Sequence, residues 1–325
     1  MVARINFFEK RINEELEKVL VIEEPRSLFD PAVYVFSLGG KRLRPILTLM
    51  AADLFNKDIE NAVNPALAVE IFHNFSLLHD DLMDNADVRR GSATVHKKWS
   101  ENTAILSGDA MVIEAYKYIV NVPDRYLRKV IDLFSQTAME ICQGQQYDMD
   151  YEKRMDVAEN EYLKMIRLKT AVLIGCSLKL GAIVSDAPEV DVEALYQFGI
   201  NLGLAFQLKD DLLDVYGDFK TFGKKPGGDI LSNKKTMLLI KALENSNDLQ
   251  KAELDKWLTV QNFNPEEKIN AVKNLYDDLN LRLLVENMVE KYYLASLECL
   301  SSINVPDVHK KNLIDLSEQL MHREK

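Results

Sequence analysis

The chain has 325 residues, 47% of them hydrophobic and 28% charged, so it is long enough to bury a substantial core. Its formal net charge of -11 argues against a nucleic-acid-binding protein, because no basic excess offsets the repulsion of phosphate groups. The three cysteines are isolated, which predicts buried thiols in a reducing compartment. No apolar run approaches the roughly 20 residues of a membrane span, and the N-terminus lacks a signal-peptide cleavage site. We therefore predict a cytoplasmic protein.

Helical patterns follow one another along the chain. Residues 5–24 space apolar side chains three and four apart, as an amphipathic helix does, and Pro25 and Pro31 are expected to bracket the connection that follows. Pro45 suits the first turn of a buried helix over residues 45–56. Further helical patterns cover residues 65–84, 102–120, 128–145, 161–184 and 192–217.

Turn-forming residues are few, with 13 glycines and nine prolines. Gly175 and Gly181, like Gly199 and Gly203, lie inside helical patterns and are expected to allow close helix packing. The stretch over residues 216–235 is loop-like, amphipathic helices follow it, and no segment shows convincing strand alternation. We therefore predict an all-α fold with a single domain over residues 1–325.

The stretch "LLHDDLMDNADVRRG" places three carboxylates close together. On a helix, Asp80 and Asp84 lie one turn apart on one face, and Asp81 lies about 100° from Asp80. Like charges at this spacing destabilise a helix. A solvated acidic face is the alternative, but the apolar "FHNFSLL" before the cluster predicts a buried helix. Mg²⁺ prefers such oxygen ligands, together with water and substrate phosphates.

The same DDxxD pattern recurs in a second apolar helix, at Asp210, Asp211 and Asp214. Two acidic helices facing each other across a cleft would hold several Mg²⁺ ions, and a diphosphate fits such a cluster. Basic residues complete the candidate site, since arginine binds phosphate oxygens bidentately and lysine supplies a point charge. Taken alone, each of these basic residues is more often a surface charge than a ligand, but two DDxxD motifs nearby reverse that expectation. The basic residues are Lys41, Arg42, Arg44, Arg89, Arg90, Lys169, Lys224 and Lys234.

Seven segments together resemble the trans-isoprenyl diphosphate synthases, the head-to-tail prenyltransferases. They run in the family's order from about residue 37 to 236: "GGKRLRP", "HNFSLLHDDLMD", "RRGSATVH", "GQQYD", "LKTAVLI", "FQLKDDLLD" and "GKKPGGD". The resemblance implies a large helical bundle around a deep central cavity (the isoprenoid synthase fold), isopentenyl and allylic diphosphate substrates, no stable membrane insertion, and a homodimer.

The resemblance also implies residue roles. Three Mg²⁺ ions per site would be held by Asp80, Asp81, Asp84, Asp210, Asp211 and Asp214, with Asp229 acting through water. The allylic diphosphate would be bound by Arg89, Lys169, Thr170, Gln207, Lys224 and Lys234. Isopentenyl diphosphate would be bound by Lys41, Arg44, His73 and Arg90. Catalytic roles would fall to Asp80, Asp84, Lys169, Asp210 and Lys224.

Two positions depart from the family's pattern. Ala93 replaces a proline that often follows the two arginines, which puts only the stiffness of that loop in doubt. Asn233 stands where a glycine is common, directly before Lys234. No group that the chemistry needs is missing.

These residues suit ionisation of an allylic diphosphate. Mg²⁺, with Arg89, Lys169 and Lys224, would neutralise the charge that develops on the departing diphosphate. The site must exclude water, which would capture the allylic cation. The double bond of isopentenyl diphosphate would attack the cation, and the departing diphosphate would accept the proton that is then lost.

Three other functions are possible on this pattern. A class I terpene cyclase also ionises a diphosphate, but its second metal motif takes an Asn/Ser/Glu form, whereas "DDLLD" is intact. A non-catalytic partner subunit of a prenyl synthase would have degraded motifs. A purely structural helical protein has no use for two buried acidic clusters.

Product length depends on the residues before the first motif, because the growing tail extends along them. Phe75 and Ser76 lie about 6–7.5 Å along the helix axis from Asp80. A large Phe75 beside a small Ser76 is similar to enzymes that make fifteen- or twenty-carbon products. "DDLMD" lacks the two extra residues typical of bacterial farnesyl synthases, which favours the twenty-carbon geranylgeranyl diphosphate over farnesyl diphosphate. The alternative is that Phe75 only packs the core.

Overall fold

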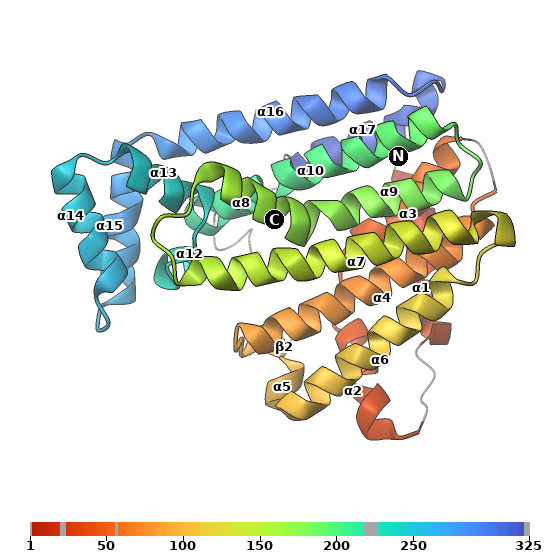
Figure 1. Ribbon diagram of the computed structural model, residues 1–325, viewed down its shortest axis with the longest axis horizontal. Helices are drawn as coiled ribbons and strands as arrows, with labels where there is room; N and C mark the ends of the chain where they lie inside the picture. The colour runs from red at the N-terminus through yellow and green to blue at the C-terminus, as the bar shows by residue number, and fades with distance from the viewer. Residues whose placement is uncertain (1, 20–23, 56–57, 218–226, 322–325) are drawn as a thin grey trace. The chain divides into compact units, whose positions relative to one another are not determined.

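The computed structural model describes residues 2–19, 24–55, 58–217 and 227–321 (Figure 1). In these ranges all the regular secondary structure is helical except for one two-stranded hairpin, so the all-α prediction is confirmed. The elements in the first part of the chain are α1 (Val2–Val19), α2 (Arg26–Ser37), α3 (Leu43–Leu54), α4 (Glu60–Met83), β1 (Val88–Arg89), β2 (Ser92–Ala93), α5 (Val95–Lys98), α6 (Glu101–Ile119) and α7 (Asp124–Glu152).

The remaining elements are α-helical apart from the π-helix η1. They are α8 (Glu159–Ile166), η1 (Arg167–Ala171), α9 (Val172–Ile183), α10 (Glu189–Tyr216), α12 (Gly228–Leu231), α13 (Met237–Asn245), α14 (Asp248–Thr259), α15 (Pro265–Asp278), α16 (Leu281–Ser301) and α17 (Asp307–Met321).

The chain divides into two compact units, each described here by itself. The first unit comprises Met1–Ala138, Leu173–Tyr196 and Ser302–Leu313. The second comprises Met139–Val172, Gln197–Ser301 and Ile314–Lys325. The single domain expected over residues 1–325 stays a prediction.

The first unit is built around α4. This helix packs mainly against α6 and also against α3, α2 and α1, and its buried side chains lie on every side of it. A helix that is apolar all round is expected to be enclosed by neighbours. Its carboxyl end, which carries the first aspartate cluster, is less enclosed, with Asp81 buried and Met83 50% exposed.

The second unit contains the carboxyl half of α10 and the short helices that follow it. Within this unit α12 packs against α15, α13 against α16 and α8, and α14 against α15. The helices on both sides of the segment between α12 and α13 are packed against α15. The second aspartate cluster lies on α10, near its carboxyl end.

Sequence-based expectations for the helices are confirmed with two corrections. Pro31 does not end the connection after Pro25: it is buried inside α2, where packing of the helix outweighs the loss of one backbone donor. Residues 161–184 are continuous but contain the π-helical turn η1 between α8 and α9. Gly181 and Gly175 do allow close packing, because an added Cβ would meet the carbonyl oxygen of Thr48 and the ring of Tyr196 respectively.

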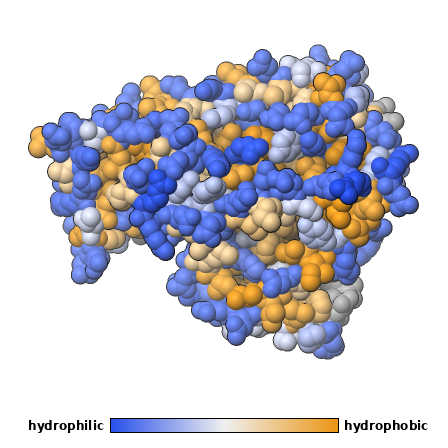
Figure 2. All heavy atoms as spheres, in the orientation of Figure 1, coloured by the Kyte–Doolittle hydropathy of each residue, from blue (hydrophilic) through white to orange (hydrophobic). Residues whose placement is uncertain are grey.

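The prediction of three buried thiols is confirmed for Cys176 only. Cys299 is partly exposed, and Cys142 is exposed on the surface of α7. No helix in the described ranges combines the length and apolar character needed to cross a bilayer. Figure 2 shows polar residues over most of the visible face, with hydrophobic residues gathered around α6.

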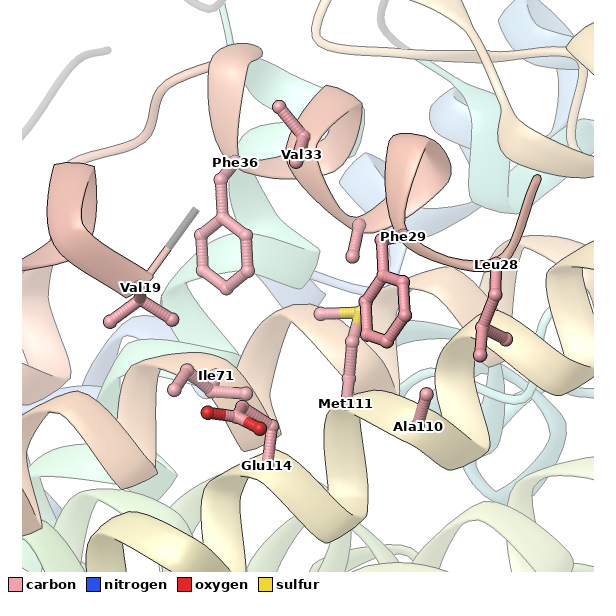
Figure 3. Close-up of a pocket in the computed structure, with 10 residues that line it drawn as sticks. Val19, Leu28, Phe29, Val33, Phe36, Ile71, Ala110, Met111 and Glu114 are labelled. Carbon is pink, nitrogen blue, oxygen red and sulfur yellow. The ribbon is translucent and has the colours of Figure 1, made fainter. Parts of the chain in front are cut away.

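An apolar pocket in the first unit contains none of the predicted site residues. Figure 3 shows side chains from α1, α2, α4 and α6 pointing into this hollow of about 60 Å³. Glu114 is the one charged residue among the described residues that line it, and its carboxylate pairs with Lys117 at 2.6 Å. The hollow thus lies on the α2 and α6 side of α4.

Candidate active site

The first aspartate cluster ends α4. Asp81 is buried, and Asp84 caps the helix with its N–H donating to the Asp80 carbonyl at 2.9 Å. Arg89 donates from Nε to both oxygens of Asp81 at 2.7 Å, and its Nη2 lies 3.8 Å from Asp80. Burial raises the pKa of Asp81, and the Arg89 guanidinium opposes that rise. Arg89 therefore bridges two of the three carboxylates.

A tight hairpin carries both arginines. Strands β1 and β2 pair antiparallel, with Arg89 opposite Ser92. Arg90 and Gly91 form the two-residue turn with φ of 52° and 76°, and positive φ at both positions is the requirement of a type I′ turn. Ala93 is held in β2, where its carbonyl accepts from the Tyr34 hydroxyl at 2.7 Å, so the missing proline leaves no loose loop.

A cationic cluster forms where this hairpin meets the loop before α3. Arg44 Nη1 donates to His73 Nε2 at 3.0 Å, and Arg90 Nη1 donates to the Gly39 carbonyl. Gly40 has φ of 145°, and an added Cβ would lie 2.9 Å from Arg90 Nη2. The double glycine of "GGKRLRP" thus gives the arginine room against the backbone.

Charge in this cluster is poorly solvated. Burial lowers the pKa of Arg44 to about 10, with Glu70 opposing the change. Burial, and next the nearby Arg44, lower the pKa of His73 well below its usual value, so His73 is a neutral acceptor. Burial and the neighbouring Arg42 lower the pKa of Arg90. An anion would relieve the repulsion among these arginines, as expected of a diphosphate site.

Sequence reasoning missed the role of the middle basic residue of "GGKRLRP". Arg42 does not face the cluster as a ligand: it is buried and donates from Nη1 to Glu70 at 2.6 Å and from Nη2 to the Phe36 carbonyl at 3.0 Å. Asn74 Nδ2 also donates to the Glu70 carboxylate, at 2.9 Å. The one sequence signal was a lone acid, Glu70, inside an apolar helix.

Residues predicted to set product length lie in an aromatic row on α4. The Phe75 ring packs edge-on against Phe72 at 5.1 Å and His79 at 4.8 Å between centroids, and Phe72 contacts Phe134 on α7 at 5.3 Å. Ser76 donates to the His73 carbonyl at 2.8 Å. The row leads away from Asp80 along the helix.

The second aspartate cluster belongs to the second unit. Asp211 is buried and accepts from the Tyr162 hydroxyl and from Gln207 Nε2, the latter at 3.3 Å. Burial, and next Asp229, raise the pKa of Asp211 to about 7. Asp214 Oδ2 accepts from the backbone N–H of Asp229 at 2.9 Å. Tyr162 was not predicted, and nothing in its local sequence marks it.

A π-helical turn presents the next two predicted residues. Lys169 and Thr170 lie on η1, and such turns are frequent at functional sites because they displace side chains from the helical register. Lys169 Nζ donates to Asp148 at 2.6 Å, and Thr170 donates to Gln207 at 3.0 Å. Gly144 permits the close approach, since a Cβ there would meet the Lys169 backbone nitrogen. Asp148 belongs to "GQQYD" but was given no role.

Two more predicted residues lie in and just after α12: Asp229 is in the helix, and Lys234 is in the turn that follows it. Asp229 and Lys234 are joined by a backbone bond from Lys234 N–H to the Asp229 carbonyl at 2.9 Å. Asn233 has φ of 56°, a left-handed conformation that asparagine tolerates better than most residues, which explains its place at a position suited to glycine. Lys224 lies outside the described residues.

The carboxylates fit a hard cation bound with its substrate. Among the described residues, no group of three or more His, Cys, Asp and Glu side chains forms a ready metal cage. Mg²⁺ usually binds through one or two carboxylates while water and substrate phosphates fill its other positions. Asp81 and Asp211, both buried beside further carboxylates, are the kind of crowded oxygen donors that such an ion stabilises.

Comparisons with known proteins agree with one another. The sequence model of the family described as polyprenyl synthetase matches residues 25–277. The geranylgeranyl pyrophosphate synthase of Geoglobus acetivorans is 42% identical over 74% of this chain and 76% of its own. The geranylgeranyl diphosphate synthase of Sulfolobus acidocaldarius is 35% identical over 98% of both chains. A crystal structure of a geranylgeranyl pyrophosphate synthase superposes with a TM-score of 0.94 at 45% identity, over 99% of each chain.

Proposed function

Since the chain belongs to the polyprenyl synthetase family, we propose that it condenses isopentenyl diphosphate with an allylic diphosphate. It is a trans-prenyltransferase with the isoprenoid synthase fold. One observation carries the substrate assignment: a basic side chain acts on each DDxxD cluster, Arg89 on Asp80 and Asp81 in the first unit and Lys234 on Asp211 in the second. We propose geranylgeranyl diphosphate as the main product, ahead of farnesyl diphosphate.

The cationic cluster on α3, α4 and the hairpin suits isopentenyl diphosphate, with Lys41, Arg44, His73 and Arg90 as ligands. Neutral His73 can orient Arg44 without adding charge, and Arg90 is held against Gly39. The allylic diphosphate is assigned to the two aspartate clusters with Arg89, Lys169, Thr170, Gln207, Lys224 and Lys234.

Ionisation of the allylic C–O bond places negative charge on the departing diphosphate. Bound Mg²⁺ ions, which we expect to number three, supply Lewis-acid stabilisation of that charge. We assign to Arg89, Lys169 and Lys224 the fixed positive charge that would add to this stabilisation. The double bond of isopentenyl diphosphate then bonds to the cation, and its C2 proton passes to the departing diphosphate. No protein nucleophile takes part in this scheme.

The proposal is tested with labelled isopentenyl diphosphate and an allylic primer in the presence of Mg²⁺. The expected products are longer allylic diphosphates, and EDTA should stop their formation. Release of a cyclic hydrocarbon would instead indicate a terpene cyclase, and complete inactivity with all primers would indicate a non-catalytic subunit. The predicted cytoplasmic location is part of the proposal and rests on the small, odd number of isolated cysteines in the sequence.

A homodimer is the second part of the proposal. On α6 the large apolar side chains of Ile105, Leu106 and Ile113 are 43%, 59% and 66% exposed, and Leu106 and Ile113 are seven residues apart, on one face. Figure 2 shows hydrophobic residues at the surface in this region. Clustered apolar residues of this kind usually mark a protein interface.

Sedimentation velocity should therefore show a dimer at micromolar concentration. Ile113→Asp should shift the protein towards monomer, because it buries a carboxylate in an apolar interface. Leu249→Asp is the control, since Leu249 is 84% exposed on α14 in the second unit. A wild-type monomer, or equal effects of the two variants, would contradict the α6 interface.

Chain length is the third part. Phe75 lies on the helix that ends in the first aspartate cluster and packs edge-on between Phe72 and His79. We propose that its ring forms the floor against which the growing tail stops. Phe75→Ala should shift the products, by mass spectrometry, to molecules longer by one or more five-carbon units.

Ser76→Thr is a companion variant that adds a methyl group in the same turn. It should shorten products or leave them unchanged, and in no case lengthen them. A Phe75→Ala enzyme that folds, turns over and makes the wild-type product distribution would show that Phe75 only packs the core.

A further inference from the structure

Residues 227–236 comprise α12 and the turn after it, and this segment is anchored through the side chain of Asn233. Its Oδ1 accepts from Lys268 Nζ on α15 at 2.7 Å, and its Nδ2 donates to the Leu258 carbonyl on α14 at 3.1 Å. The residue has a φ of 56°, which orients it for both contacts at once. One side chain thereby joins the segment to two helices.

Lys268 is unusual because it is only 1% exposed. Lysine is almost never fully buried unless it is paired. Among the described residues its contacts are with neutral groups: Asn233, the Leu231 carbonyl at 3.3 Å, and the Phe263 ring at 4.4 Å from the centroid. Burying an ammonium group costs free energy, and an apolar side chain at this position would avoid that cost. The hydrogen bond to Asn233 is what an apolar side chain could not provide.

The other end of the same segment is fixed to the second aspartate cluster. The N–H of Gly227 donates to the Asp214 carbonyl at 2.6 Å, and the N–H of Asp229 donates to the Asp214 carboxylate at 2.9 Å. Gly227 also packs against Ile269, since an added Cβ would lie 2.7 Å from that side chain. Ile269 is the neighbour of Lys268, so α15 contacts both ends of the segment.

Two residues assigned to the allylic diphosphate and its metal ions, Asp229 and Lys234, lie at these anchors. Asp229 lies in α12, which has four residues and is too short to be stable by itself. Lys234 directly follows Asn233. Because neither is fixed by long secondary structure, their positions depend on the anchors.

We propose that Lys268 and Asn233 are positioning residues that hold Asp229 and Lys234 for binding of the allylic diphosphate. The inference rests on the proposed function. Neither residue touches the substrate. Their contact acts through the backbone of residues 227–236, much as a residue that hydrogen-bonds to a metal ligand holds that ligand in its orientation.

Lys268→Met tests the proposal with steady-state kinetics on both substrates. The Michaelis constant for the allylic diphosphate should rise roughly tenfold or more, as is typical when a residue that orients a binding group is lost. The constant for isopentenyl diphosphate should stay within about twofold, because its predicted ligands lie in the first unit. Affinity for inorganic diphosphate with Mg²⁺, measured by calorimetry, should fall by a similar factor without any turnover.

Asn233→Gly is the second variant. Glycine keeps the left-handed backbone but removes both side-chain bonds. It should reproduce the Lys268→Met pattern, and the double variant should be no worse than either single one, since both changes break one contact. Lys310→Met is the matched control: Lys310 is 6% exposed, lies on α17 in the first unit, and pairs with Asp307 at 3.4 Å.

The outcomes separate the two proposals. The positioning role is wrong if the wild-type enzyme extends the allylic primer but neither single variant changes binding. In that case both variants would keep the allylic Michaelis constant and the diphosphate affinity within about twofold of the wild-type values. Equal effects on both substrates, or equal effects of Lys310→Met, would also overturn it, because they indicate general loss of stability. If Lys268→Met does not fold, Asn233→Gly decides. Absence of prenyl transfer in the wild type would contradict the proposed function instead.

Discussion

Asp80→Ala and Asp210→Ala should each lower the rate of chain elongation about a thousandfold or more. Each change removes a carboxylate predicted to hold Mg²⁺, and a metal ion supplies several kcal/mol of charge stabilisation to a departing diphosphate. The two residues come from different aspartate clusters, on α4 and on α10. The measurement is turnover of labelled isopentenyl diphosphate at saturating primer and Mg²⁺.

Asp132→Ala provides the control for these variants. Asp132 is a half-exposed carboxylate on α7 that pairs with Arg128 four residues earlier at 2.6 Å, and it lies in none of the motifs. Its loss should leave turnover unchanged. Near wild-type turnover in both Asp80→Ala and Asp210→Ala would show that the clusters do not hold the metal.

Glu70→Leu should lower the free energy of unfolding by roughly 3–5 kcal/mol. The change leaves Arg42 buried without its carboxylate, at a place where the guanidinium and the carboxylate are only 7% and 3% exposed. Breaking one partner of a buried ion pair is costly because the remaining charge is neither solvated nor neutralised. Urea denaturation measures the loss.

Two further variants separate the pair from its surroundings. Arg42→Met with Glu70→Leu should recover most of the stability, since no uncompensated charge remains. Glu286→Leu breaks an exposed pair with Arg282, 40% and 59% exposed, and should cost at most about 1 kcal/mol. A loss for Glu70→Leu no larger than for Glu286→Leu would mean that the buried pair contributes little.

The helices and the two clusters were predictable because their signals are local. Apolar residues three and four apart favour a helix wherever they occur, so α1, α3, α6 and α10 appear where the pattern predicts them. The spacing of Asp80 and Asp84 places them on one turn in any helix. Glycine adopts positive φ easily, and this local preference is used by the double glycine before Lys41 and by Gly91 in the hairpin turn.

Contacts between residues far apart in the sequence were decided only by the tertiary structure. Three basic residues in "GGKRLRP" are equivalent in the sequence, yet Arg42 is turned inward to Glu70, 28 residues away, while Arg44 contacts His73. Lys268 and Asn233 are 35 residues apart, and nothing local relates them. The physical reason is that periodicity and backbone propensity determine which face of a helix is apolar, whereas the burial of a particular charge depends on the helix that packs against it.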